Sequence, residues 1–97
     1  MATQNALFAI LTVAKPSVVE AKLQTVASWP HLNLNPGEWL LVAPAGTTTK
    51  EVCERVGIEA GQTTGLVVRI DTYFGLGPQS LWEWISTKRG AELGTPA

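Results

Sequence analysis

The sequence lacks several features that define common classes of protein. Its single cysteine, Cys53, excludes both an intramolecular disulfide and a cysteine-based metal cluster. No apolar run reaches the length of about 18 residues that a membrane-spanning helix needs, and we expect no membrane partner. Clustered Lys and Arg, on which sequence-independent nucleic-acid binding depends, are missing too, since seven basic and eight acidic residues leave a formal net charge of −1. The charge pattern leaves room only for a small local nucleic-acid site.

The composition that remains is that of an ordinary globular domain. Of the 97 residues, 45% are hydrophobic and 15% are charged, which suits one hydrophobic core. An apolar stretch at residues 6–14 has no basic residue before it and no clear cleavage site, so we interpret it as a buried strand rather than a signal peptide. We therefore predict a cytoplasmic protein with one domain over residues 1–90 and a disordered tail over residues 91–97.

The order of the predicted elements indicates an α+β fold. Pro16 marks a helix start, a Thr-x-x-Glu capping box at Thr48 and Glu51 marks another, and Gly57 is a good C-terminal cap. The turn at residues 35–38 joins two strands as a hairpin. The predicted strands cover residues 6–13, 31–34, 39–43 and 66–72, and the predicted helices cover residues 16–28, 48–56 and 78–89.

This β-α-β-β-α-β order is the ferredoxin-like arrangement. We predict a four-stranded antiparallel sheet with two helices on one face, plus a C-terminal helix. No predicted helix covers the second face of the sheet. An apolar face left in water favours association, so we expect a homodimer and allow for a protein partner.

The aromatic residues of the last third predict where the contact lies. On the C-terminal helix, Leu81, Trp84 and Ile85 share one stripe, whereas Trp82 points about 100° away from it. An exposed tryptophan on a small protein is typical of an interface. We expect residues 66–72 and 78–89 to form an arm that packs on the second subunit. The interface candidates are Tyr73, Phe74, Trp82 and Arg69.

Few residues carry a signal for catalysis. His31, the single histidine, could act as a general base with an orienting carboxylate such as Glu38 across the hairpin, or could simply pack near a tryptophan. Cys53 lies between acidic residues that would raise its pKa, which indicates an inert thiol. Arg69 and Asp71 share one strand face, as in a solvated or interfacial ion pair. No metal-ligand spacing occurs among the acids, and we predict no metal and no cofactor.

Several motifs together resemble a known group of proteins. They are Trp29-Pro30-His31, Trp39-Leu40-Leu41-Val42, Thr47–Val52, and Val67–Tyr73 followed by Gly75 and Trp84. The pattern is similar to small bacterial ferredoxin-like proteins related to the CRISPR-adaptation nuclease and the GhoS-type antitoxin ribonucleases. The resemblance implies a homodimer. It also implies, for the metal-dependent members, an aspartate at the end of the first strand.

The chain departs from that pattern at the first strand, which ends in Leu11-Thr12-Val13-Ala14-Lys15 without an acid. Two hypotheses follow. The first is a homodimeric interaction or regulatory protein without an evident catalytic site. The second is a nucleic-acid-binding protein or endoribonuclease of the resembled superfamily, with His31, Lys15 and Arg69 as the contacts to nucleic acid.

Overall fold

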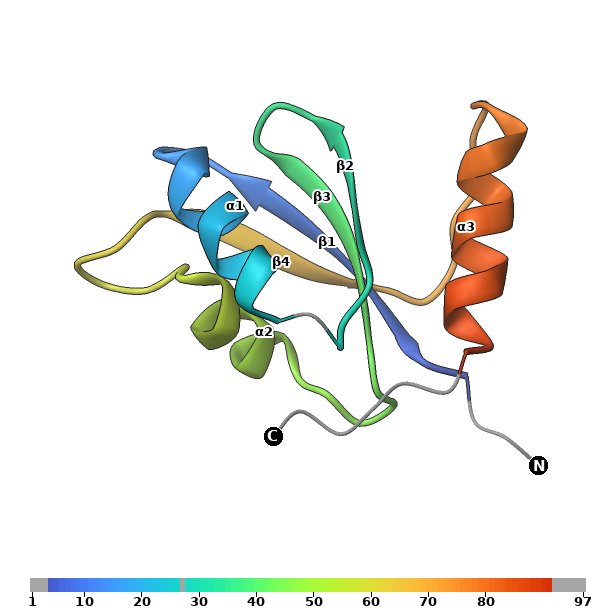
Figure 1. The fold of residues 1–97 in the computed structure, drawn as a ribbon, viewed down its shortest axis with the longest axis horizontal. Coiled ribbons are helices and arrows are strands. Elements are labelled where there is room, and N and C mark those ends of the chain that lie inside the picture. The colour runs from blue at the N-terminus through green and yellow to red at the C-terminus, as the bar shows by residue number, and fades with distance from the viewer. Residues whose placement is uncertain (1–3, 27, 92–97) are drawn as a thin grey trace.

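The structure is a computed structural model that describes residues 4–26 and 28–91. Its strands form an antiparallel sheet in the order β2-β3-β1-β4, so β1 and β3 lie in the centre (Figure 1). This is the predicted ferredoxin-like α+β arrangement with an added C-terminal helix. The elements in chain order are β1 (Ala6–Thr12), α1 (Pro16–Thr25), β2 (His31–Asn35), β3 (Glu38–Ala43), α2 (Thr49–Val56), β4 (Gly65–Ile70) and α3 (Gln79–Arg89).

The sequence signals for α2 act as expected. The Thr48 hydroxyl accepts a hydrogen bond from the Glu51 amide at 3.1 Å, and the Glu51 carboxylate accepts one from the Thr48 amide at 3.1 Å. Gly57 ends the helix with a φ of 82°, in the left-handed region that glycine adopts at low cost. Two other predicted elements were too long by more than one residue. Helix α1 ends at Thr25, whose hydroxyl donates to the Lys22 carbonyl at 2.6 Å, and β4 ends at Ile70.

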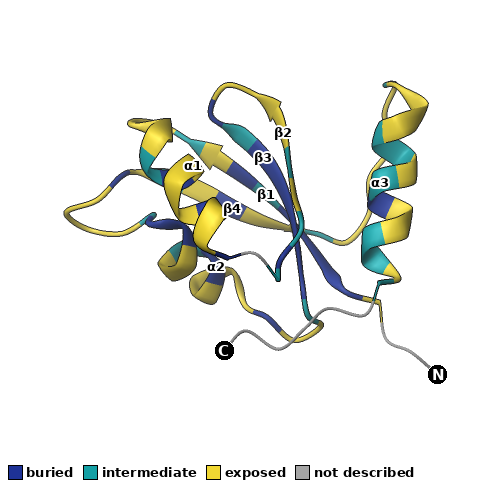
Figure 2. Cartoon of the chain, in the orientation of Figure 1, coloured by how far each residue is buried: buried dark blue, intermediate teal, exposed yellow. Residues whose placement is uncertain are grey.

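The sheet is apolar on both faces, which explains why the first strand is a continuous apolar run. The α1/α2 face carries the two helices that connect the strands, and the α3 face is the opposite one (Figure 1). Burial is concentrated on the two central strands, as Figure 2 shows. Core residues of the α1/α2 face include Phe8, Ile10, Leu41, Val19, Leu23, Val52 and Val56. The core of the α3 face consists of Leu7, Leu40, Val42 and Ile85.

Helix α3 packs on the chain's own sheet, which corrects the expectation of a bare second face. Ile85 is buried at 3% exposure against the α3 face, and Leu81 and Trp84 are partly buried beside it. The predicted inner stripe is therefore confirmed. Its partner, however, is the sheet of the same chain.

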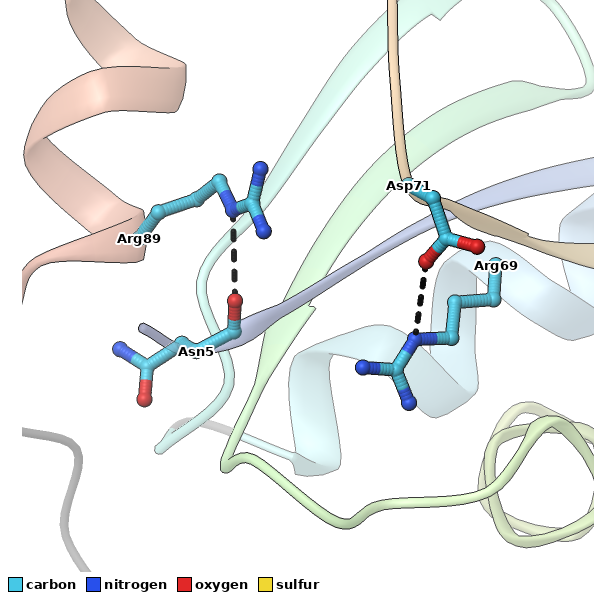
Figure 3. Close-up of polar contacts among 4 residues, drawn as sticks. All are labelled: Asn5, Arg69, Asp71 and Arg89. Carbon is cyan, nitrogen blue, oxygen red and sulfur yellow. Dashed lines mark hydrogen bonds and ion pairs between the residues drawn. The ribbon is translucent and has the colours of Figure 1, made fainter. Parts of the chain in front are cut away.

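Hydrogen bonds tie the end of α3 to the start of β1. The Asn5 amide nitrogen donates to the Arg89 carbonyl at 2.8 Å, and its side-chain nitrogen donates to the carbonyls of Lys88 at 3.0 Å and Ala91 at 2.6 Å. The Arg89 Nε returns a hydrogen bond to the Asn5 carbonyl at 3.3 Å (Figure 3). Because Asn5 is itself buried, these bonds fix one end of the helix.

The remainder of the predicted tail, residues 92–97, lies outside the described residues. In the described ranges, no helix combines the length and the hydropathy that crossing a membrane would require.

Candidate interaction surface

The loop between β4 and α3 is built around the ring of Trp82. Tyr73 stacks on that ring with the centroids 6.3 Å apart and the planes inclined by 5°. A Cβ atom added at Gly75 or Gly77 would come within 3.7 Å of the same indole, so the backbone of the loop lies close to the ring. Trp82 is partly buried against the α3-face core as well. Trp82 therefore has partners in its own chain, and its role in an interface stays a prediction.

The same loop presents two apolar side chains to solvent. Phe74 and Leu76 are fully exposed, at 103% and 102%. They alternate with Tyr73, Gly75 and Gly77, which contact or approach Trp82. Packing on the tryptophan thus leaves the intervening residues directed outward. Among the predicted interface candidates, Phe74 has the largest exposed apolar surface.

A second apolar surface lies on the part of the α3 face that the helix leaves open. Leu11 and Leu66 are register partners on β1 and β4 and are 40% and 56% exposed, and Val68 beside them on β4 is 40% exposed. We call these three residues the β4 strip. Half-buried Ala9 and Ile70 join the strip to the core under α3. Sequence analysis did not single out the strip, although the alternation of Leu66 and Val68 with buried Val67 was its signal.

The predicted pair of Arg69 and Asp71 forms, but on an exposed surface. The Arg69 Nε lies 3.6 Å from the Asp71 carboxylate, as Figure 3 shows, and more than half of each side chain is exposed. An ion pair in that setting contributes little to stability. Its effect is to neutralise the one basic side chain of β4.

The three predicted contacts to nucleic acid do not converge on one hollow. His31 lines a groove of about 510 Å³ between α1 and the β2–β3 hairpin, together with Glu20, Gln24 and Trp39. Lys15 lines a different groove of about 480 Å³ beside the loop that precedes β4. Arg69 lines neither groove.

Glu38, the carboxylate suggested as a partner of His31, lies at the opposite end of the β2–β3 pairing. His31 pairs with Leu41 at one end of β2, whereas Glu38 pairs with Asn35 at the other end. The Asn35 side chain donates to the Glu38 carboxylate at 3.1 Å. Glu20, four residues into α1, is the acid that shares the groove with His31.

Metal ligands do not gather in the part of the chain that the structure describes. Within residues 4–26 and 28–91, no three side chains of His, Cys, Asp and Glu are placed to hold a metal ion together. At the end of β1, where the resembled nucleases carry an acid, the Thr12 hydroxyl donates to the Gly37 carbonyl at 2.9 Å. That hydrogen bond ties the end of β1 to the hairpin turn.

Cys53 is partly buried on α2 against the α1/α2-face core. Burial raises the pKa of its thiol, and the nearby Glu54 carboxylate raises it further. Less thiolate is then present at neutral pH than in an exposed cysteine.

We expect iodoacetamide to modify Cys53 more slowly in the folded protein than in the same protein unfolded in urea at the same pH. Because the folded pKa is raised, the stability that this thiol contributes is present below its unfolded pKa and is lost as the pH rises through its folded pKa. Cys53→Ala should therefore flatten the alkaline limb of a stability-versus-pH curve. Equal alkylation rates in the two states would contradict the expectation.

No family of known proteins matches the chain, and neither a curated protein nor a solved structure shows significant similarity to it.

Proposed function

We propose that the chain is a small cytoplasmic homodimeric interaction or regulatory protein without an evident catalytic site. The observation that carries this proposal is the exposed apolar surface on a chain with few charges. It comprises the β4 strip on the sheet and the pair of Phe74 and Leu76 on the loop before α3. Soluble monomers rarely expose contiguous apolar patches that have no binding role.

Both surfaces are held in place by the fold, and this rigidity supports a role in recognition. The β4 strip belongs to a regular strand, so its side chains are fixed by the sheet. Phe74 and Leu76 are held by the packing of Tyr73 and the loop glycines on Trp82. Preorganised apolar groups bind with a smaller loss of conformational entropy than flexible ones.

The expected result in solution is a dimer of the 10.4 kDa chain. Sedimentation velocity over a range of protein concentrations should show a species of about twice the monomer mass, because contact between two copies withdraws part of the exposed apolar surface from water. A monomer at every concentration would contradict the proposal.

The same preparation should leave labelled RNA and DNA uncut with magnesium or manganese. Cleavage that chelation and Asp71→Ala both abolish would contradict the absence of catalysis.

We also propose kinship with the superfamily of the CRISPR-adaptation nuclease and the GhoS-type antitoxin ribonucleases. Its support is the βαββαβ order, together with the burial of Trp29 and Trp39 and the capping role of Thr48.

A nucleic-acid-binding protein or endoribonuclease is the alternative function. The observation that favours it is the groove that His31 lines with Glu20, since an imidazole and a carboxylate are the groups that general acid–base catalysis on a nucleotide uses. RNA binding or cleavage by the native protein that His31→Ala removes, with the fold unchanged by circular dichroism, would support this alternative over the first.

A further inference from the structure

Within the described residues, strand β4 is an open edge of the sheet without a bulge, a proline or a lysine. It runs regularly from Gly65 to Ile70 in register with β1, and no strand of the described residues pairs with its other side. Edge strands present unpaired backbone N–H and C=O groups, which proteins block with bulges, proline, lysine or a covering element. Within β4 the single charged residue is Arg69, which Asp71 already neutralises.

The opposite edge of the sheet is protected. Strand β2 carries a register shift between Asn33 and Asn35. At that irregular end of the hairpin, the Asn33 side chain donates at 3.0 Å to the carbonyls of both Asn35 and Glu38. This contrast between two edges of one sheet identifies β4 as the edge that is available for pairing.

We propose that β4 pairs antiparallel with β4 of a second copy, about a two-fold axis that passes through Val68. This inference rests on the proposed function, because it specifies the geometry of that homodimer. The two sheets then form one continuous eight-stranded sheet. Both copies contribute the same strand, as a two-fold symmetric interface requires.

The register follows from which side chains are exposed. A two-fold axis perpendicular to the sheet places residues of the same face opposite one another, so the pairing keeps the two α3 faces on one side. Centred on Val68, the strands place Val68 opposite Val68 of the second copy and Leu66 opposite its Ile70. Centred on Val67, they leave Ile70 without an apolar partner. The first register therefore buries more of the apolar surface next to the edge.

The charges are compatible with this register. On the α1/α2 face, Arg69 lies opposite Val67 of the second copy, where its aliphatic stem can pack while its guanidinium stays with Asp71 of its own strand at 3.6 Å. The seam thus contains no unpaired charge. A second copy fits this edge because the sequence Leu66–Ile70 alternates apolar side chains symmetrically about Val68.

Symmetric cysteine cross-linking tests the register directly. Val68→Cys is introduced into a Cys53→Ala background, and the full chain is oxidised under mild conditions. Residues directly opposite one another on antiparallel strands have Cα atoms about 4.5–5.5 Å apart, within the range that a disulfide spans. We expect a disulfide-linked dimer on non-reducing electrophoresis that a reductant reverses.

Leu66→Cys in the same background is the matched control. Leu66 is on the same strand face and more exposed than Val68, so it would form at least as much disulfide by random collision. In the proposed register, however, Leu66 and its counterpart are four residues out of alignment, or about 13 Å apart, and cannot be bridged. The double variant Leu66→Cys with Ile70→Cys should cross-link again.

The outcomes separate the two proposals. Cross-linking of Val68→Cys and of the double variant, but not of Leu66→Cys, supports the β4 seam. A dimer by sedimentation of the reduced variants without Val68 cross-linking, or with cross-linking of Leu66→Cys instead, overturns the seam and leaves the homodimer intact. A reduced Val68→Cys variant that sediments as a monomer, when the native chain is also monomeric, overturns both.

Discussion

Replacing Phe8 with alanine is expected to lower the free energy of unfolding by about 3–5 kcal/mol, the largest loss that we predict for a single substitution. Phe8 lies in the middle of β1, is fully buried, and belongs to the core between the sheet and helices α1 and α2. Truncation removes most of an aromatic side chain and leaves a cavity, because the surrounding strands do not collapse into the site. Small domains have total stabilities of about 5–15 kcal/mol, so the variant should be partly unfolded near its working temperature.

Urea unfolding followed by circular dichroism measures this effect, at one fixed protein concentration because association is coupled to folding. Leu11→Ala is the matched control, because Leu11 lies on the same strand but is 40% exposed on the other face. It should cost well under half as much. Similar losses for the two variants would show that the α1/α2-face core does not dominate the stability of the domain.

Much of the fold could be predicted because local signals and hydrophobic patterns agreed. The capping box at Thr48, the glycine at Gly57 and the alternation in residues 66–70 each determine local structure with neighbouring residues alone. The antiparallel order then follows from one short connection, the β2–β3 hairpin, and two helical ones. The fold of such a chain can be predicted because its local signals agree with its overall topology.

The place of α3 could not be predicted in the same way. The stripe of Leu81, Trp84 and Ile85 shows which side of the helix is buried, but amphipathicity does not say which surface it is buried against. One end of the helix is fixed by the buried side chain of Asn5, whose partners are 83 and 86 residues away in sequence. An asparagine near a strand start carries no signal for such distant bonds.

The candidate site was predictable only in part. Phe74, an interface candidate, is fully exposed and its role in an interface stays a prediction, whereas Arg69 and Asp71 do form the expected pair. The role of Trp82 was not predictable, because its stacking on Tyr73 depends on how a glycine-containing loop turns back toward the helix. For the same reason the groove that brings His31 and Glu20 together required the three-dimensional structure. The two residues come from separate elements whose relative position is set by packing.

Ile85→Ala is expected to release α3 from the sheet while the rest of the domain stays folded. Ile85 is the one buried residue among the eleven of α3, so its loss removes the centre of the contact with Leu7, Leu40 and Val42. Truncation of a buried isoleucine costs about 2–5 kcal/mol when the surrounding structure stays in place.

Here the helix can open locally instead, because Ile85 is its one buried residue and Phe74 and Leu76 in the connecting loop are fully exposed, while the Asn5 hydrogen bonds keep its far end tethered. The loss should therefore appear as local opening rather than as global unfolding.

Two measurements distinguish local from global loss. Amide hydrogen exchange should accelerate in α3 but not in β1 or β3. Tryptophan fluorescence should shift to longer wavelength, because Trp82 and Trp84 enter water while Trp29 and Trp39 remain in the α1/α2-face core.

Thr87→Ala is the control, since Thr87 is an exposed residue of the same helix and its replacement leaves the contact unchanged. If Ile85→Ala leaves both exchange and fluorescence of α3 at native values, the hydrogen bonds of Asn5 are sufficient to dock the helix. If it instead unfolds the whole domain, the α3 face is part of the cooperative core. The exposed apolar residues of that face, Leu11, Leu66 and Val68, then extend a core surface into solvent, which is typical of an interaction site.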